Sequence, residues 1–344
     1  MTYNIVALPG DGIGPEIMEA GLAVLKAVAA YEGFDYEVVS CDFGGGAIDT
    51  FGMPLPTPTL KAAKEADAIL HGSIGDPRFD NEAIRPEQGL LEIRKELGLF
   101  SNIRPLKIYD ALKAVSPIKN VENVDFVVVR ELTGGIYFGK HTLNENDAED
   151  VCSYTKHEVE RVAHAAFKLA RTRRKKVTSI DKQNVLATSK LWRKVVSEVA
   201  KNYPDVELHH QLVDSAAMLF ITNPQQFDVI VTENLFGDIL TDEAAAIAGT
   251  LGVMASSSKG DKVAFYEPIH GSAPDIAGLG IANPIGMISS VAMMLSDTFG
   301  LHGAAKKIED AIEQTLKDGI LTKDLGGNAT TQAVCNGIIS RLDY

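Results

Sequence analysis

Residues 3–28 read YNIVALPGDGIGPEIMEAGLAVLKAV, and this stretch already indicates the class of fold. The apolar run Tyr3–Leu8 predicts a first strand, and Pro15 is typical of the first turn of a helix. After Pro15 the apolar residues recur three and four positions apart, which places them on one helical face. These positions are Ile17, Ala20, Gly21, Val24, Leu25 and Val28.

The same alternation of short β-branched runs with helical patterns continues along the chain, and it predicts an α/β protein with much parallel sheet. Further strands are expected at Tyr36–Ser40, Ala68–Leu70, Phe126–Val129, Val177–Ile180, Val206–Leu212 and Asp228–Thr232.

A length of 344 residues suits two domains of roughly 150 residues each. The cluster Asn102–Pro105 and the Gly- and Ser-rich stretch Gly249–Gly260 are interpreted as loops that cross between two lobes. One lobe would then comprise residues 1–98 and 249–344, and the other residues 99–248.

Charge and composition exclude several classes of partner. Lys and Arg total 33 against 46 Asp and Glu, a net charge of −13, and such a surface repels the phosphates of nucleic acid. The longest apolar stretch, Ile285–Leu295, is far shorter than the roughly 20 residues that span a bilayer. The 3 cysteines are scattered and the N-terminus does not resemble a signal peptide. We therefore expect a cytoplasmic protein with neither nucleic acid nor a membrane as its partner.

The segment Gly10–Pro15 follows a strand and opens a helix, where phosphate-binding turns occur. Its spacing differs from G-x-G-x-x-G, because Pro15 occupies the position of the third glycine, and it lacks a Walker lysine. Two interpretations stay open at this point: a structural tight turn or a ligand-binding loop.

Asp238 and Asp242 are four residues apart in a predicted helix, so both carboxylates would project from one face. A carboxylate pair without nearby His or Cys suits Mg²⁺ or Mn²⁺ better than zinc. The alternative is a solvated acidic surface, which the apolar run Ala244–Ala248 makes less attractive.

Other polar residues lie where strands end, and the crevices of α/β proteins form there. Arg130 closes a predicted strand, Lys182 follows another, and Tyr137 lies in a glycine-rich segment after Arg130. Several guanidinium groups could bind carboxylates, and a Tyr with a Lys could transfer protons. Each of them could also be an ordinary surface residue. Glu267–Asp275 is interpreted as a long ordered loop.

Six motifs, in order, give these residues a common context: LPGDGIGPE (8–16), RPEQGLLEIRKELGLFSNIRP (85–105), RELTGGIYFG (130–139), DKQNVL (181–186), TENLFGDILTDE (232–243) and EPIHGSAPDIAGLGIANP (267–284). Together they resemble the β-decarboxylating dehydrogenase family of isocitrate and isopropylmalate dehydrogenases, over essentially the whole chain. The resemblance implies two α/β lobes around a cleft, with a dinucleotide held on loops of the first lobe instead of a Rossmann turn.

The resemblance also implies roles for individual residues. Substrate carboxylates would be held by Arg94, Arg104 and Arg130, and a divalent metal, Mg²⁺ or Mn²⁺, by Asp238, Asp242 and Asp214, the last from the partner subunit of a homodimer. Lys182, also from the partner, would accept the C2 hydroxyl proton, and Tyr137 would protonate C3. The residues that match the NAD loops are Ile13, Glu87, His270, Gly271, Ser272, Ala273, Asp275, Ile276 and Asn283.

Within the family, the segment before Arg94 indicates the substrate. Relatives that act on isocitrate place Ser and Asn there to meet a third carboxylate, whereas this chain has Leu90 and Leu91. With Val185 of the partner, these side chains would bury an isopropyl group, which supplies roughly 2 kcal/mol. The implied reaction is the NAD-dependent oxidative decarboxylation of 3-isopropylmalate to 4-methyl-2-oxopentanoate and CO2 in leucine biosynthesis.

NAD is expected over NADP because the Asp275 carboxylate would accept hydrogen bonds from the ribose hydroxyls and repel a 2′-phosphate. One departure from the family follows Gly139, where relatives continue Glu-Pro-Arg-Gly in the intersubunit clasp and this chain has Lys140-His141-Thr142-Leu143. Three rival functions fit the residues less well. A dehydrogenase of D-malate or tartrate would carry a His- and Trp-containing segment before the second arginine, and a non-catalytic regulatory subunit would lack catalytic side chains that are present here. A phosphate-transfer enzyme that uses the GDGIG turn would need a lysine that the turn lacks.

Overall fold

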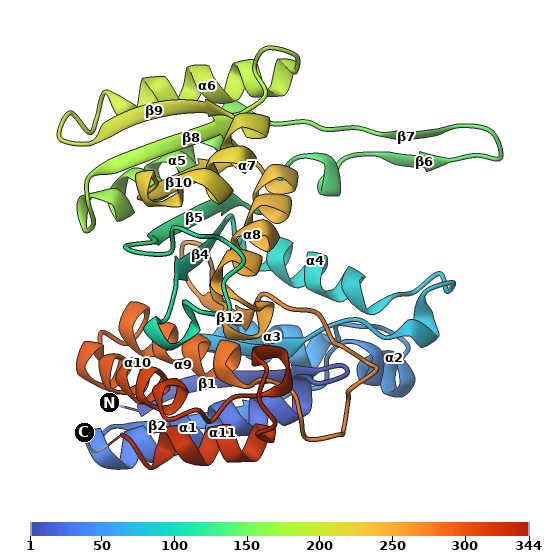
Figure 1. Cartoon of the computed structure of the whole chain (residues 1–344). Helices are drawn as coiled ribbons and strands as arrows, with labels where there is room; N and C mark the ends of the chain where they lie inside the picture. Colours follow the sequence, from blue (N-terminus) through green and yellow to red (C-terminus); the bar gives the residue numbers. More distant parts are fainter. Residues whose placement is uncertain (1, 343–344) are drawn as a thin grey trace. The chain divides into compact units, whose positions relative to one another are not determined.

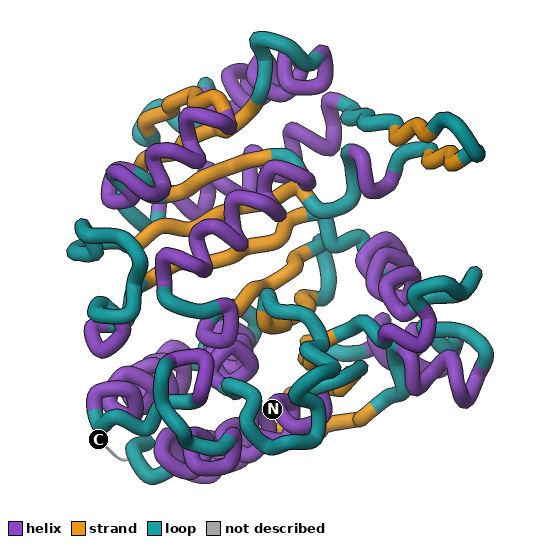
Figure 2. Tube along the Cα trace, turned by 45° about the vertical axis from the view of Figure 1, so that its right-hand side comes forward, coloured by secondary structure: helices purple, strands orange, loops and turns teal. Residues whose placement is uncertain are grey.

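The computed structural model describes residues 2–342 and consists of two compact units. Unit 1 contains the described residues up to Leu97, the segment Tyr109–Val115 and the described residues from Gly249 onward. Unit 2 contains Gly98–Ile108 and Ser116–Ala248. In each unit, helices pack on a mostly parallel set of strands, which confirms the predicted α/β class (Figures 1 and 2).

The strands of unit 1 lie in the order β2-β1-β3-β12-β11, and all neighbours are parallel except β11 and β12. Their bounds are β1 Thr2–Gly10, β2 Asp35–Ser40, β3 Ala68–Ser73, β11 Ala255–Lys259 and β12 Ala264–Pro268. The helices of this unit are α1 Gly14–Glu32, α2 Gly45–Phe51, α3 Thr57–Glu65, α4 Pro86–Glu96, α9 Ile285–Asp297, α10 His302–Lys317 and α11 Thr331–Ile339.

The first strand and helix form as the sequence predicts. Helix α1 has Pro15 in its first turn and is capped after Glu32 by Gly33, whose φ of 74° is the left-handed conformation that glycine favours. The predicted apolar face is buried, with Ile17, Val24 and Leu25 fully inaccessible. This face packs against α9 and α11, so burial of an amphipathic face stabilises the helix.

The strands of unit 2 lie in the order β4-β5-β10-β8-β9, and only β4 runs antiparallel to its neighbour. Their bounds are β4 Ser101–Lys107, β5 Asp125–Glu131, β8 Lys176–Asp181, β9 Glu207–Leu212 and β10 Val229–Thr232. The helices are α5 Lys156–Arg171, α6 Ala187–Ala200, α7 Val213–Thr222 and α8 Asn234–Ala248. Helices α5 and α6 pack on each other, and α8 packs on β4 and β5.

The expectation of a loop was wrong for Asn102–Pro105 and wrong only in part for two other segments, since residues 269–275 form a loop as expected. Asn102–Pro105 lies inside strand β4, Gly249–Gly260 contains strand β11, and Glu267 and Pro268 end strand β12. These strands lack β-branched runs: β11 reads ASSSK, and its three serines are buried between neighbours. Pairing with β12 and β5 overrides the weak local preference of such residues.

The segment after Gly139 forms a two-stranded hairpin of β6 (His141–Leu143) and β7 (Ala148–Asp150), which extends from unit 2 (Figure 1). A Cβ atom at Gly139 would lie 1.7 Å from the carbonyl oxygen of Val151, so the hairpin needs glycine where its two arms approach. Among the described residues, no helix has the length and apolar character needed to cross a membrane.

Candidate functional site

The Gly10–Pro15 turn in unit 1 is hydrogen-bonded to other backbone segments of the same unit. The N–H groups of Asp11 and Ile13 donate to the carbonyl oxygens of Ser73 (2.9 Å) and Ser272 (2.8 Å). The buried Asp11 carboxylate accepts hydrogen bonds from Gly45 N (2.7 Å) and Gly75 N (3.0 Å). Because protein groups occupy these donors and acceptors, the geometry favours the structural interpretation of this turn over a phosphate-binding one.

The turn supports a second loop, which contains most of the residues expected to bind the dinucleotide. Ser272 accepts the hydrogen bond from Ile13, and the Ser272 and Glu87 side chains both lie beside Gly75. Ala273 has a φ of 41°, a left-handed backbone that a non-glycine residue adopts only when its surroundings impose it. Asp275 is exposed, and Ile276 is hydrogen-bonded back to Ala273 at 3.1 Å.

His270 and Asn283 flank this loop. Burial lowers the pKa of His270, and its Nε2 atom is buried with no hydrogen-bond partner among residues 2–342. Asn283 donates to Asp324 at 3.0 Å and accepts from Ile285 N at 3.0 Å. An orphaned ring nitrogen beside a strained, partly exposed loop fits a site that a ligand completes.

Helix α4 presents Glu87, Leu90, Leu91 and Arg94 at positions i, i+3, i+4 and i+7, so they share one face. Glu87 is exposed, and the two leucines and Arg94 are half-buried. The two apolar side chains therefore accompany a guanidinium on a face that is partly open to solvent.

Arg94 is held by a buried carboxylate that the sequence did not single out as its partner. Its Nη2 atom lies 3.0 Å from Glu267 Oε1, and the other oxygen of Glu267 lies 3.0 Å from His71 Nδ1. Burial alone would raise the pKa of Glu267, but Arg94 and His71 outweigh it and bring that pKa to about 2. Glu267 is therefore an anion that fixes the position of Arg94.

In unit 2, the carboxylate of Asp238 on α8 contacts two of the predicted site residues. Arg130 Nη1 lies 2.5 Å from Asp238 Oδ1, and the Tyr137 hydroxyl donates to Asp238 Oδ2 at 3.0 Å. A Cβ atom at Gly237 would lie 2.7 Å from Arg130 Cγ, so glycine lets the arginine pass close to the helix. Burial and the Asp238 charge raise the pKa of Tyr137, which keeps its phenol protonated and able to donate a proton.

Arg104 reaches the same helix face from β4. Its guanidinium lies 3.7 Å from Asp238 Oδ1 and 4.0 Å from Asp242 Oδ1, while Nη1 donates to the Thr241 hydroxyl at 2.5 Å. Burial raises the pKa of Asp242, and the charge of Arg104 opposes that shift. The two aspartates thus share one face of α8, as predicted, and that face is lined by arginines.

Lys182 and Asp214 pair with each other: Lys182 Nζ lies 2.8 Å from Asp214 Oδ1, and Lys182 lowers the pKa of Asp214. Neither has a hydrogen bond or ion pair to Asp238, Asp242 or Tyr137 among those found in residues 2–342. Val185, in the same turn as Lys182, is 65% exposed. Among residues 2–342, Lys182 and Asp214 therefore pair with each other and not with the Asp238 cluster.

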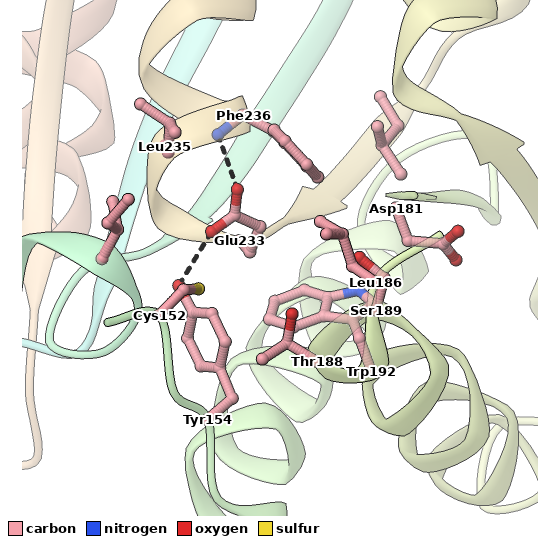
Figure 3. Close-up of a pocket in the computed structure, with 12 residues that line it drawn as sticks. Cys152, Tyr154, Asp181, Leu186, Thr188, Ser189, Trp192, Glu233, Leu235 and Phe236 are labelled. Carbon is pink, nitrogen blue, oxygen red and sulfur yellow. Dashed lines mark hydrogen bonds between the residues drawn. The ribbon is translucent and has the colours of Figure 1, made fainter. Parts of the chain in front are cut away.

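A pocket of about 180 Å³ lies beside the start of α8 (Figure 3). Its walls are largely apolar and include Trp192, Leu186 and Phe236. On one side the Tyr154 hydroxyl donates to Glu233 at 3.2 Å, and Phe236 N donates to the same carboxylate at 2.9 Å (Figure 3). These bonds fix the start of the helix that carries Asp238 and Asp242, and neither Tyr154 nor Glu233 was predicted.

The donor set of unit 2 suits a hard divalent cation only in part. Asp238 and Asp242 offer carboxylate oxygens, the ligands that Mg²⁺ and Mn²⁺ prefer. Among residues 2–342, no three His, Cys, Asp or Glu side chains are grouped so that they could hold a metal ion. The pair therefore fits a metal site that needs further oxygen ligands.

A family model described as isocitrate/isopropylmalate dehydrogenase matches residues 4–341. The chain belongs to this family. The resemblance predicted from the motifs is thereby confirmed, and dehydrogenases of this type use a dinucleotide and a divalent metal.

The 3-isopropylmalate dehydrogenase of Lactococcus lactis is 65% identical over 341 residues, 98% of this chain and 99% of the relative. That of Streptococcus pneumoniae is 63% identical, over 99% of this chain and 100% of the relative. Among solved structures, isocitrate dehydrogenase from Methylococcus capsulatus matches with a TM-score of 0.91 and 36% identity, covering 99% of this chain and 100% of that one. A β-decarboxylating dehydrogenase from Thermococcus kodakarensis matches with a TM-score of 0.84 and 38% identity, covering 99% of this chain and 96% of that one.

Proposed function

We propose that this chain oxidises 3-isopropylmalate at C2 with NAD and decarboxylates it to 4-methyl-2-oxopentanoate and CO2, a step of leucine biosynthesis. The observation that carries the chemistry is the grouping of Arg130, Tyr137 and Asp238 around one carboxylate. It supplies a cation for the substrate, a proton donor and an oxygen ligand. Relatives named 3-isopropylmalate dehydrogenase, more than 60% identical over nearly the whole chain, support the choice of substrate.

Three arginines bind the two substrate carboxylates. Arg130 and Arg104 both reach the face of α8 that carries the aspartates. Arg94 is kept in place by the buried Glu267 anion. Guanidinium groups match carboxylates geometrically, so these residues orient C2 and C3 as well as neutralise charge.

Two residues transfer protons, one as a base at C2 and the other as an acid at C3. Oxidation at C2 needs a base for the hydroxyl proton, and Lys182 accepts it at Nζ. After the carboxylate at C3 leaves as CO2, that carbon needs a proton, and Tyr137 donates one from its hydroxyl. The raised pKa of Tyr137 supports this role, because the phenol stays protonated at neutral pH.

Asp238 and Asp242 would hold the divalent metal, Mg²⁺ or Mn²⁺, with Asp214 of the partner subunit as a further ligand. When bound, such an ion lowers the pKa of the substrate hydroxyl and stabilises negative charge after decarboxylation. The arginines beside these aspartates neutralise their charge until the ion binds the aspartates and the substrate carboxylates bind the arginines.

NAD would bind on unit 1, at the strained loop that contains Ala273 and Asp275. It supplies the hydride acceptor for oxidation of C2. The exposed carboxylate of Asp275 can accept hydrogen bonds from ribose hydroxyls, and it disfavours a 2′-phosphate. The free thiols of Cys41, Cys152 and Cys335 support a reducing compartment such as the cytoplasm.

Leu90 and Leu91 favour 3-isopropylmalate over isocitrate. Both share the α4 face of Arg94 and are half-buried, so they can cover an isopropyl group but cannot pair with a third carboxylate. An unpaired charge against apolar side chains costs several-fold more than a missing methyl group.

We infer that the active unit is a homodimer in which Lys182, Asp214 and Val185 serve the partner's site. The chain's own aspartate pair lacks a third ligand among the described residues. Met218 on α7 and Ile239 on α8 are 65% and 60% exposed, which suits a face covered by a second copy. Mixing Lys182→Ala with Asp238→Ala chains tests the sharing: randomly mixed dimers should regain about a quarter of wild-type activity. No recovery despite proven exchange of subunits would contradict it.

A panel of 2-hydroxy acids that includes 3-isopropylmalate, isocitrate and D-malate, each with NAD and Mg²⁺ and followed by NADH absorbance, tests the substrate. We expect kcat/KM to be highest for 3-isopropylmalate. A preference for isocitrate or D-malate would refute the substrate, whereas nucleotide turnover without NADH formation would support the phosphate-transfer rival.

A further inference from the structure

Asn234, the first residue of α8, links two groups that the proposed reaction uses. Its side chain is 1% exposed, and Oδ1 accepts a hydrogen bond from Arg130 Nε at 3.0 Å. Its Nδ2 donates to the carbonyl oxygen of Gly134 at 3.1 Å. One amide therefore joins the arginine at the end of β5 to the loop that leads to Tyr137.

The loop has a second support behind it. A Cβ atom at Gly134 or Gly135 would lie 2.7 or 2.3 Å from the Tyr154 side chain, so the glycines rest directly on that ring. The Tyr154 hydroxyl accepts from the backbone N–H of Asn234 at 3.0 Å and donates to Glu233 at 3.2 Å. Figure 3 shows Tyr154 and Glu233 joined at the edge of the pocket. The start of α8, the ring and the loop thus form one rigid assembly.

From this geometry we propose that Asn234 is a positioning residue for the decarboxylation: it sets Arg130 for the substrate carboxylate and the Thr133–Gly135 loop for Tyr137. It touches no reacting atom. Both ends of the side chain are needed, because the arginine requires an acceptor and the Gly134 carbonyl requires a donor. The proposal rests on the proposed function and adds a residue to it.

The substitution Asn234→Asp distinguishes the acceptor role of the side chain from its donor role. The variant keeps the acceptor for Arg130 but loses the donor to Gly134 and places a carboxylate against a carbonyl oxygen. It also draws the Arg130 charge toward itself and away from substrate. Asn234→Ser keeps a neutral polar residue at the start of the helix but is too short to join both partners.

We expect both variants to raise the KM for 3-isopropylmalate about tenfold and to lower kcat by about 10- to 100-fold, since misplacement by about 1 Å costs on that order. The KM for NAD should stay within about twofold, because the residues expected to bind NAD belong to unit 1. Slower protonation at C3 follows hydride transfer, so the deuterium isotope effect on kcat with C2-deuterated substrate should fall toward unity.

The experiment compares wild type, Asn234→Asp, Asn234→Ser and the control Asn223→Asp, each as the purified full chain. Asn223 is exposed and follows α7, so its variant adds the same charge to unit 2 away from Arg130. Each variant is also made in a Tyr137→Phe background, where the kcat effect of changing Asn234 should largely disappear because the two act as one unit.

Wild-type activity on 3-isopropylmalate is measured first, and its absence would refute the proposed function itself. If wild type is active, two results would overturn the positioning role. One is a folded Asn234 variant with wild-type kcat and KM. The other is a loss of kcat with unchanged KM and isotope effect, which would indicate only a smaller fraction of folded enzyme.

Discussion

Replacement of Gly12 by alanine tests whether the Gly10–Pro15 turn is a support for the neighbouring loop. Gly12 has a φ of 57°, and a Cβ atom there would lie 2.0 Å from the carbonyl oxygen of Ser272. The carbonyl carbon and Cβ of Ser272 would each lie 2.8 Å from the added atom, and none of these three Ser272 atoms can rotate away, because they belong to the backbone or to the start of a side chain. The methyl group must displace the segment that contains Ala273 and Asp275.

The magnitude has two parts. A left-handed alanine costs about 1–2 kcal/mol, and overpacking adds about 1–3 kcal/mol, so the free energy of unfolding should fall by roughly 2–5 kcal/mol. Gly33→Ala is the matched control: its φ is 74°, yet nothing lies within 4 Å of the added Cβ atom. It should cost only the conformational part, about 1–2 kcal/mol.

The assay is urea unfolding followed by circular dichroism, together with the KM for NAD of the folded enzyme. Gly12→Ala should be less stable than Gly33→Ala, and it alone should raise the KM for NAD, by about tenfold for a shift near 1 Å. Equal stability of the two variants with an unchanged KM for NAD would show that the turn does not support the loop.

Three further predictions concern single side chains. Tyr137→Phe should lower kcat for decarboxylation by about 10²-fold or more and leave the KM for 3-isopropylmalate within about threefold, as measured by steady-state kinetics; a raised KM at constant kcat would make Tyr137 a binding residue. Asp275 should give NAD at least about a tenfold advantage over NADP in kcat/KM, since one charge clash exceeds 1 kcal/mol, and equal use of both would contradict this. Glu267 has a pKa of about 2 in the folded protein against 4.5 ordinarily, so it stabilises the fold above pH 4.5 and loses that effect as the pH falls toward 2. The difference in unfolding free energy between wild type and Glu267→Gln should therefore shrink by roughly 3 kcal/mol over that interval in urea titrations, and a difference independent of pH would show that Glu267 is not ionised.

Sequence patterns predict those elements whose residues carry a strong local preference. The strand at Tyr3–Leu8 and the helix after Pro15 are examples, because β-branched runs and a 3.6-residue period do not depend on distant contacts. Strand β11 has neither signal, since its small serines are strand residues only through their pairing with β12. Local preference could not have revealed it.

In the candidate site too, features set by local spacing were predicted and features set by distant contacts were not. The spacing of Asp238 and Asp242 predicts their common face on α8, which the structure confirms. The roles of these residues toward metal, substrate and cofactor stay predictions. The partners of the arginines could not be predicted, because Glu267 lies 173 residues from Arg94 and Asn234 lies 104 residues from Arg130. The one signal available was that Asn234 and Glu267 lie inside motifs of the family.

Product stoichiometry tests the central proposal most directly. Purified enzyme is incubated with 3-isopropylmalate, NAD and Mg²⁺, and NADH, CO2 and the organic product are measured in the same reaction. The arrangement of Tyr137, Arg130 and Asp238 predicts one CO2 and one 4-methyl-2-oxopentanoate for each NADH formed. NADH without CO2, or no NADH from this substrate, would contradict it.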